Sequence, residues 1–107
     1  MLSKAELKEL KALQDVKGRT AEGAFLAEGI KLTGELLGAF DCRLLVGTSE
    51  SLQALTPLLR QLPSGKRPQR IEEVGESFDW SRVSSLRQPQ PLIAVFALPE
   101  PASSQAF

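Results

Sequence analysis

The chain has 107 residues, of which 42% are hydrophobic, with 13 basic and 13 acidic residues and no histidine. This length and apolar content suit one compact domain with a single core. A net charge of zero excludes a uniformly basic nucleic-acid binder, so any such role needs basic residues gathered on one face. The lone Cys42 excludes an internal disulfide and argues against a Cys/His metal site, so we expect a small buried residue there. Without a long apolar run or a leader-like start, the sequence predicts a soluble cytoplasmic domain that binds no membrane.

The first predicted element is a helix over residues 4–17. Ser3 and Glu6 form a capping box at its start, and leucines then recur at helical spacing. Gly18 is the expected stop. The lysines of this helix fall on its outer face.

The rest of the chain alternates between apolar runs of strand length and helical patterns. Pro57 should divide the helical region of residues 52–62 into two short pieces, with Thr56 capping the second. The inner side of the second long helix should hold Ile30, Thr33, Leu36, Leu37 and Phe40. The expected elements are strands at 25–27, 43–47, 71–74 and 92–98, a helix at 30–39, a helical turn at 77–86, and an exposed loop at 63–69.

This alternation predicts the fold class α/β, as a three-layer α/β/α sandwich with about four mostly parallel strands. The order of the strands is not determined by the sequence. Residues 1–98 form the predicted domain, and the Pro/Ser/Ala-rich residues 99–107 form a predicted linker.

The chemistry-bearing residues argue against catalysis by this chain. There is no histidine to act as a general base and no glycine-rich phosphate loop. Glu72 and Glu73 are adjacent on a predicted strand, so their side chains point to opposite faces. We therefore expect no catalytic residue, no cofactor site and no metal site within the chain.

Basic residues make the better case for a function, because arginine and lysine bind phosphate. The alternative, that they are ordinary solubilising charges, stays open. Glu28 is expected to cap the following helix or to pair with Lys17 or Arg19. Trp80 is expected to be partly buried, although stacking on a base is an alternative. The candidate RNA-binding residues are Lys17, Arg19, Lys66, Arg67, Arg82 and Arg87.

Two segments carry a resemblance to a known family. The first runs from Lys17 through Arg19 to Gly23, Phe25, Glu28 and Gly29, after a helix containing Lys8 and Lys11. The second has Ser84 and Ser85 before Pro89 and Gln90, then Ile93-Ala94-Val95, with Pro91 where the family has glycine. Together they resemble the N-terminal substrate-binding domain of SpoU/TrmH-family RNA methyltransferases.

The resemblance implies a fold similar to that of kink-turn-binding ribosomal proteins and a partner that is structured RNA, ribosomal rather than transfer RNA. It implies that residues 99–107 lead to an absent knotted domain, which binds S-adenosylmethionine and methylates a ribose 2′-hydroxyl. The parent enzyme would be a homodimer and this fragment a monomer. Two alternatives remain open, namely a stand-alone RNA-binding protein of the same fold and a protein-interaction module.

Overall fold

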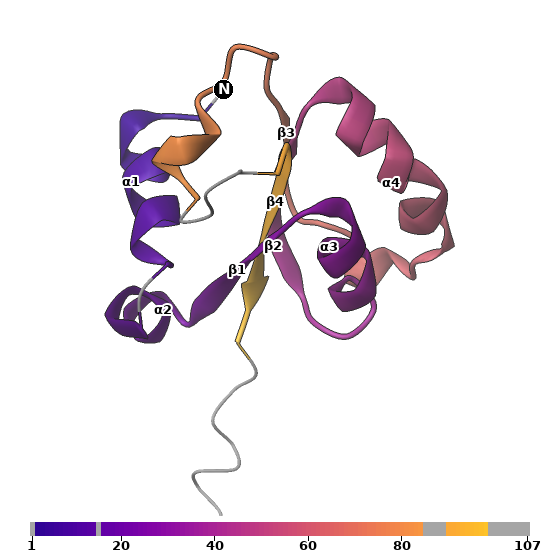
Figure 1. Cartoon of the computed structure of the whole chain (residues 1–107). Coiled ribbons are helices and arrows are strands. Elements are labelled where there is room, and N and C mark those ends of the chain that lie inside the picture. Colours follow the sequence, from indigo (N-terminus) through magenta and orange to yellow (C-terminus); the bar gives the residue numbers. More distant parts are fainter. Residues whose placement is uncertain (1, 15, 85–89, 99–107) are drawn as a thin grey trace, which may run out of the picture.

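The computed structural model describes residues 2–14, 16–84 and 90–98 (Figure 1). A central sheet separates two layers of helices and turns. The helices are α1 (Lys4–Ala12), α2 (Val16–Glu22), α3 (Ile30–Leu36) and α4 (Ser49–Gln61), with single 3-10 turns η1 (Ser64–Lys66) and η2 (Trp80–Arg82). The strands are β1 (Ala24–Glu28), β2 (Cys42–Gly47), β3 (Ile71–Glu73) and β4 (Leu92–Ala97).

The sheet has the strand order β1-β4-β2-β3 and is mixed rather than mostly parallel. β4 runs antiparallel to both β1 and β2, whereas β2 and β3 are parallel. β3 ends and β4 begins at the same end of the sheet, where β2 ends. Two hydrogen bonds show this: Val74 N–H donates to the Gly47 carbonyl, and Thr48 N–H donates to the Pro91 carbonyl. A parallel strand would have required a crossover to the opposite end.

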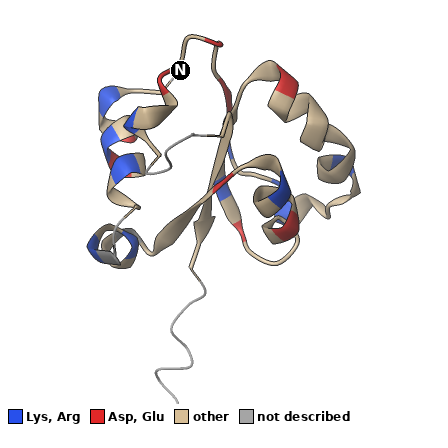
Figure 2. Ribbon diagram, in the orientation of Figure 1, with Lys and Arg blue, Asp and Glu red and all other residues tan. Residues whose placement is uncertain are grey.

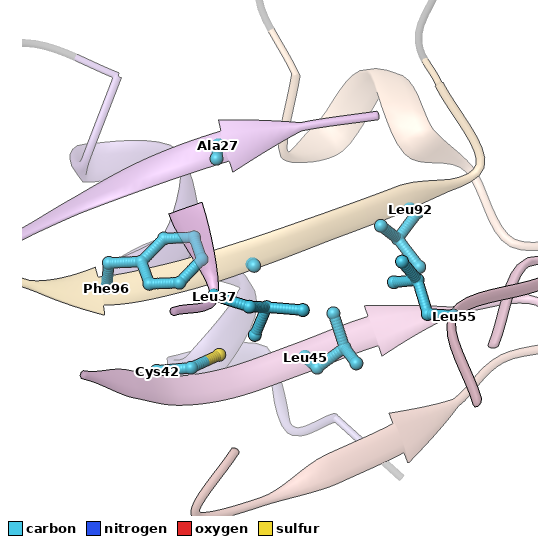
Figure 3. Close-up of a cluster of buried hydrophobic side chains, with 8 residues drawn as sticks. Ala27, Leu37, Cys42, Leu45, Leu55, Leu92 and Phe96 are labelled. Carbon is cyan, nitrogen blue, oxygen red and sulfur yellow. The ribbon is translucent and has the colours of Figure 1, made fainter. Parts of the chain in front are cut away.

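The core lies on both faces of the sheet, which confirms the α/β fold class. One face is covered by α3 and α4, whose Leu37 and Leu55 pack on Leu45 and Phe96 (Figure 3). The other is covered by α1 and by residues 74–83. β4 is buried on both faces, as expected for a central strand that is apolar throughout. No helix in the described part of the chain is long and apolar enough to cross a membrane.

The predicted single helix over residues 4–17 is wrong. The Ser3–Glu6 capping box is present, but α1 ends at Ala12 and a second helix, α2, begins at Val16. Gly18 lies inside α2 rather than stopping a helix. A β-carbon on Gly18 would lie 1.8 Å from the Ala12 carbonyl oxygen, so glycine is what allows α2 to turn so tightly onto the end of α1.

The predicted division of the third helical region at Pro57 is also wrong. α4 is one helix capped by Thr48, and it contains Pro57. Proline has no backbone N–H, so one carbonyl of the preceding turn loses its hydrogen bond. This loss costs little stability because Pro57 is exposed and the carbonyl lies next to solvent. Thr56 is not a cap, since its hydroxyl donates to the Leu52 carbonyl within the helix at 3.0 Å.

Two further expectations were only partly met, and a third was confirmed. The helix expected over residues 77–86 is reduced, within the described residues, to η2. On α3, Thr33 and Leu37 are fully buried as expected, but Ile30 is 38% exposed. Cys42 is buried as predicted, and this burial raises the pKa of its thiol to about 11, which leaves it unreactive at neutral pH.

Candidate nucleic-acid interface

Lys17 and Arg19 both lie on α2. The Arg19 guanidinium turns back to the end of α1, where Nη1 donates to the carbonyl oxygens of Leu13 at 3.4 Å and Gln14 at 3.2 Å. It thereby satisfies carbonyls that α1 leaves without partners. Lys17 is exposed and makes no hydrogen bond or ion pair within the described residues. Arg19 therefore fixes the joint between the helices, while Lys17 is free to bind a ligand.

The joint between α1 and α2 brings together basic residues that the sequence analysis treated separately. The outer lysines of α1 are exposed, and Figure 2 shows that α1 and α2, both carrying Lys or Arg positions, lie on the same side of the molecule. We refer to these residues as the elbow strip: Lys4, Lys8, Lys11, Lys17 and Arg19. The sequence signal for the first three was their position opposite the leucines of the helix, but their position relative to Lys17 depends on the turn at residues 13–14 that follows α1.

Lys66 and Arg67 lie beyond α4, away from the elbow strip. The Lys66 ammonium pairs with the Asp41 carboxylate at 3.2 Å, and the Arg67 Nε donates to the Leu62 carbonyl near the end of α4 at 3.3 Å. Both side chains thus have partners within the fold. An RNA contact by either residue would have to compete with these interactions.

Arg82 lies at the other end of the sheet from α2, beside Glu73 and Phe78. Arg87 lies outside the described residues. Trp80 is half-buried, as predicted, with its ring edge-on to Phe78 at a centroid distance of 4.8 Å. The six candidate residues therefore do not form one surface.

The two segments that carry the family resemblance meet at the carboxyl end of β1. Gly29 N–H donates to the Leu92 carbonyl at 2.8 Å. Gly29 has a φ of +96°, and a β-carbon there would lie 3.4 Å from the Gln90 side chain. The distance to Gln90 is an ordinary van der Waals contact, so it is the positive φ that favours glycine here. Gly23, at the other end of β1, also has a positive φ, and Pro89 lies outside the described residues.

Neither role expected of Glu28 is present. Gly29 occupies the cap position of α3 without a side-chain hydrogen bond, and Glu28 forms no ion pair within the described residues. Lys17 and Arg19 could not reach it, because α2 precedes the opposite end of β1. The Oε1 atom of Glu28 is buried without a hydrogen-bond partner.

An ion-pair network that the sequence analysis missed anchors α1 to the sheet. The Arg70 guanidinium binds the Glu6 carboxylate on α1 and the Glu72 carboxylate on β3, the latter at 2.7 Å. These partners are far apart in sequence, and only the packing of α1 on the sheet brings them together. The hydrogen bond from Arg70, followed by that from the Ser3 backbone, lowers the pKa of Glu6.

This anchor should weaken in acid. Because the folded-state pKa of Glu6 is lowered, its contribution to stability is present above its ordinary pKa of 4.5 and is lost as the pH falls through the folded value. We expect urea unfolding to show Glu6→Gln as less stable than wild type at about pH 7, with the difference shrinking as the pH is lowered below 4.5. Glutamine keeps the capping hydrogen bond, so a difference that persists in acid would contradict an ionic origin.

Comparison with models of known families identifies the family of this chain. The model of the MRM3-like substrate binding domain matches residues 4–94. The chain belongs to this family. The match covers both the elbow strip and the Gly29–Gln90 contact. No curated protein matches the chain.

Solved structures show where such a domain occurs. This MRM3-like domain is 42% identical to a Porphyromonas gingivalis protein assigned to the TrmH family of RNA methyltransferases, with a TM-score of 0.78, over 94% of this chain and 37% of that one. An RNA 2′-O ribose methyltransferase has 23% identity and a TM-score of 0.64, over 92% and 36% of the two chains. The SpoU methyltransferase AviRb from Streptomyces viridochromogenes, solved with AdoMet, has 20% identity and a TM-score of 0.62, over 91% and 36%. The last two likenesses show the fold alone. The chain spans little more than a third of each of these proteins.

Proposed function

We propose that this domain recognises the RNA substrate of an S-adenosylmethionine-dependent ribose 2′-O-methyltransferase. The observation that carries the proposal is the match of a substrate-binding family to residues 4–94. The 42% identity to the Porphyromonas gingivalis protein assigned to the TrmH family supports it. Structured RNA is the proposed ligand, ribosomal rather than transfer RNA, and the parent enzyme is proposed to be a homodimer.

The proposal assigns RNA recognition to this chain and cofactor binding and methyl transfer to another domain. The chain contains no histidine to act as a general base and no glycine-rich phosphate loop. No residue of this chain is therefore assigned to the cofactor or to methyl transfer. Both belong to a further domain, to which residues 99–107 would lead.

Within the domain, the elbow strip is the best candidate for the RNA contact. It combines four exposed lysines on two helices with Arg19, which holds the helices together, and Lys17 has no competing partner within the described residues. Lysines gain affinity for RNA by neutralising phosphates and releasing counterions. The remaining predicted RNA-binding residues are either paired within the fold or lie elsewhere on it.

Charge reversal on the elbow strip tests this assignment. We expect the double variant Lys8→Glu/Lys17→Glu to bind a fluorescently labelled RNA stem-loop about tenfold more weakly than wild type, because both changes place a carboxylate beside phosphates. Fluorescence anisotropy would measure the affinity, and the wild-type affinity should fall steeply with salt. The matched control is Lys31→Glu with Arg60→Glu, on α3 and α4, which changes the net charge equally.

Equal weakening by the control pair would show that only net charge matters and would remove the elbow strip from the interface. Absence of any salt-dependent RNA binding by the wild-type domain would contradict RNA recognition by this domain.

A further inference from the structure

A cleft of about 620 Å³ lies where the start of α4 faces the chain between β3 and η2. Glu50 and Gln53 line it from α4, Glu73 and Glu76 from the end of β3 and beyond, and Trp80 and Pro91 complete the lining. It opens at the end of the sheet where β2 and β3 finish, whereas α2 precedes the start of β1. The cleft and the α2 part of the elbow strip are therefore at different ends of the sheet.

The charged residues that line this cleft, within the described part of the chain, are all glutamates: Glu50, Glu73 and Glu76. All three are exposed. Neighbouring carboxylates repel an RNA phosphate and attract a cation, most strongly in a concave site that concentrates the field. Charge complementarity thus favours a positively charged occupant over a nucleotide.

Trp80 adds a second feature that favours a cation. Its ring is half-buried, packs against Phe78 at an interplanar angle of 74°, and lines the cleft. A guanidinium or ammonium group is attracted to the face of an indole ring, and tryptophan is the best side chain for this interaction. Pro91 contributes apolar surface that suits the aliphatic stem of lysine or arginine.

We propose that this cleft binds an arginine or lysine side chain on a basic segment of a partner protein. The carboxylates pair with the charged head, and Trp80 contacts it through its ring. This interaction goes beyond RNA recognition and uses a different surface. The domain can thereby bind RNA through the elbow strip and a basic protein segment in this cleft.

The single tryptophan of the chain makes the proposal directly measurable. A capped peptide of six arginines is titrated into the domain at low ionic strength while Trp80 emission is followed. We expect saturable binding with a change in emission, and affinity about threefold lower for both Glu50→Gln and Glu76→Gln. The matched control is Glu35→Gln, an exposed carboxylate on α3 outside the cleft lining, which should bind like wild type. Calorimetry on Trp80→Leu, whose emission is lost, should also show weaker binding.

Three results would overturn the proposal. In the first, the peptide binds without altering Trp80 emission. In the second, Glu35→Gln weakens binding as much as the cleft variants, which indicates diffuse attraction. In the third, an RNA oligonucleotide changes Trp80 emission and binds more tightly to Glu50→Gln, which assigns the cleft to RNA. Lys8→Glu/Lys17→Glu should retain peptide binding, so failure of the elbow-strip assignment and failure of this proposal are separable.

Discussion

Replacing Gly18 with alanine is expected to lower the free energy of unfolding by about 3 kcal/mol. The added methyl group would lie 1.8 Å from the oxygen and 2.5 Å from the carbon of the Ala12 carbonyl. Both are backbone atoms at the end of α1, so no side-chain rotation can relieve the clash. The joint between α1 and α2 must open, which would break the hydrogen bonds from Arg19 to Leu13 and Gln14 and displace Lys17. Urea unfolding would measure the loss.

The control for this substitution is Gly38→Ala. Gly38 lies just beyond α3, and an added β-carbon there would have no heavy atom within 4 Å. Alanine at such a site leaves stability unchanged or raises it by about 0.5 kcal/mol, because it restricts the unfolded chain. If Gly18→Ala were as stable as Gly38→Ala, the close approach of α2 to Ala12 would be wrong. RNA binding by Gly18→Ala under folding conditions should also weaken, since the elbow strip depends on this joint.

Phe96→Ala is expected to cost about 4 kcal/mol of unfolding free energy. Phe96 is fully buried on the central strand, where its ring centroid lies 5.6 Å from that of Phe25 and 6.4 Å from that of Phe40. Removing the ring leaves a cavity between the sheet and α3 and also disrupts these aromatic contacts. A domain of this size has a total stability of about 5–15 kcal/mol, so much of it would be lost. Chemical denaturation would measure the difference.

Phe96→Leu is the matched variant, because it keeps most of the apolar volume and should cost about 1 kcal/mol. A similar loss for leucine and alanine would mean that ring shape rather than buried volume matters at this site. An unchanged stability for Phe96→Ala would contradict the position of β4 at the centre of the sheet. Neither substitution touches the elbow strip, so RNA affinity per folded molecule should stay at the wild-type value.

The sequence by itself determined which segments form regular structure when the local pattern was decisive. Ser3 and Glu6 determine the start of α1, because a capping box involves only residues three apart. The apolar run before Pro99 predicted a strand over residues 92–98, and β4 forms there, buried on both faces. The resemblance carried by the segments around Gly29 and Gln90 also gave the correct family, since such motifs are local in sequence.

The tertiary structure alone decided how those elements relate in space. The ends of β2 and β3, and the return of the chain beside Thr48, make β4 antiparallel, and no local pattern encodes that direction. In the sequence Gly18 indicates a helix stop, yet it lies within α2. Only a residue without a β-carbon can approach the Ala12 carbonyl this closely. The candidate sites follow the same rule. Lysines spaced along two helices become one strip, and glutamates from α4 and from beyond β3 line one cleft, because long-range packing sets these distances.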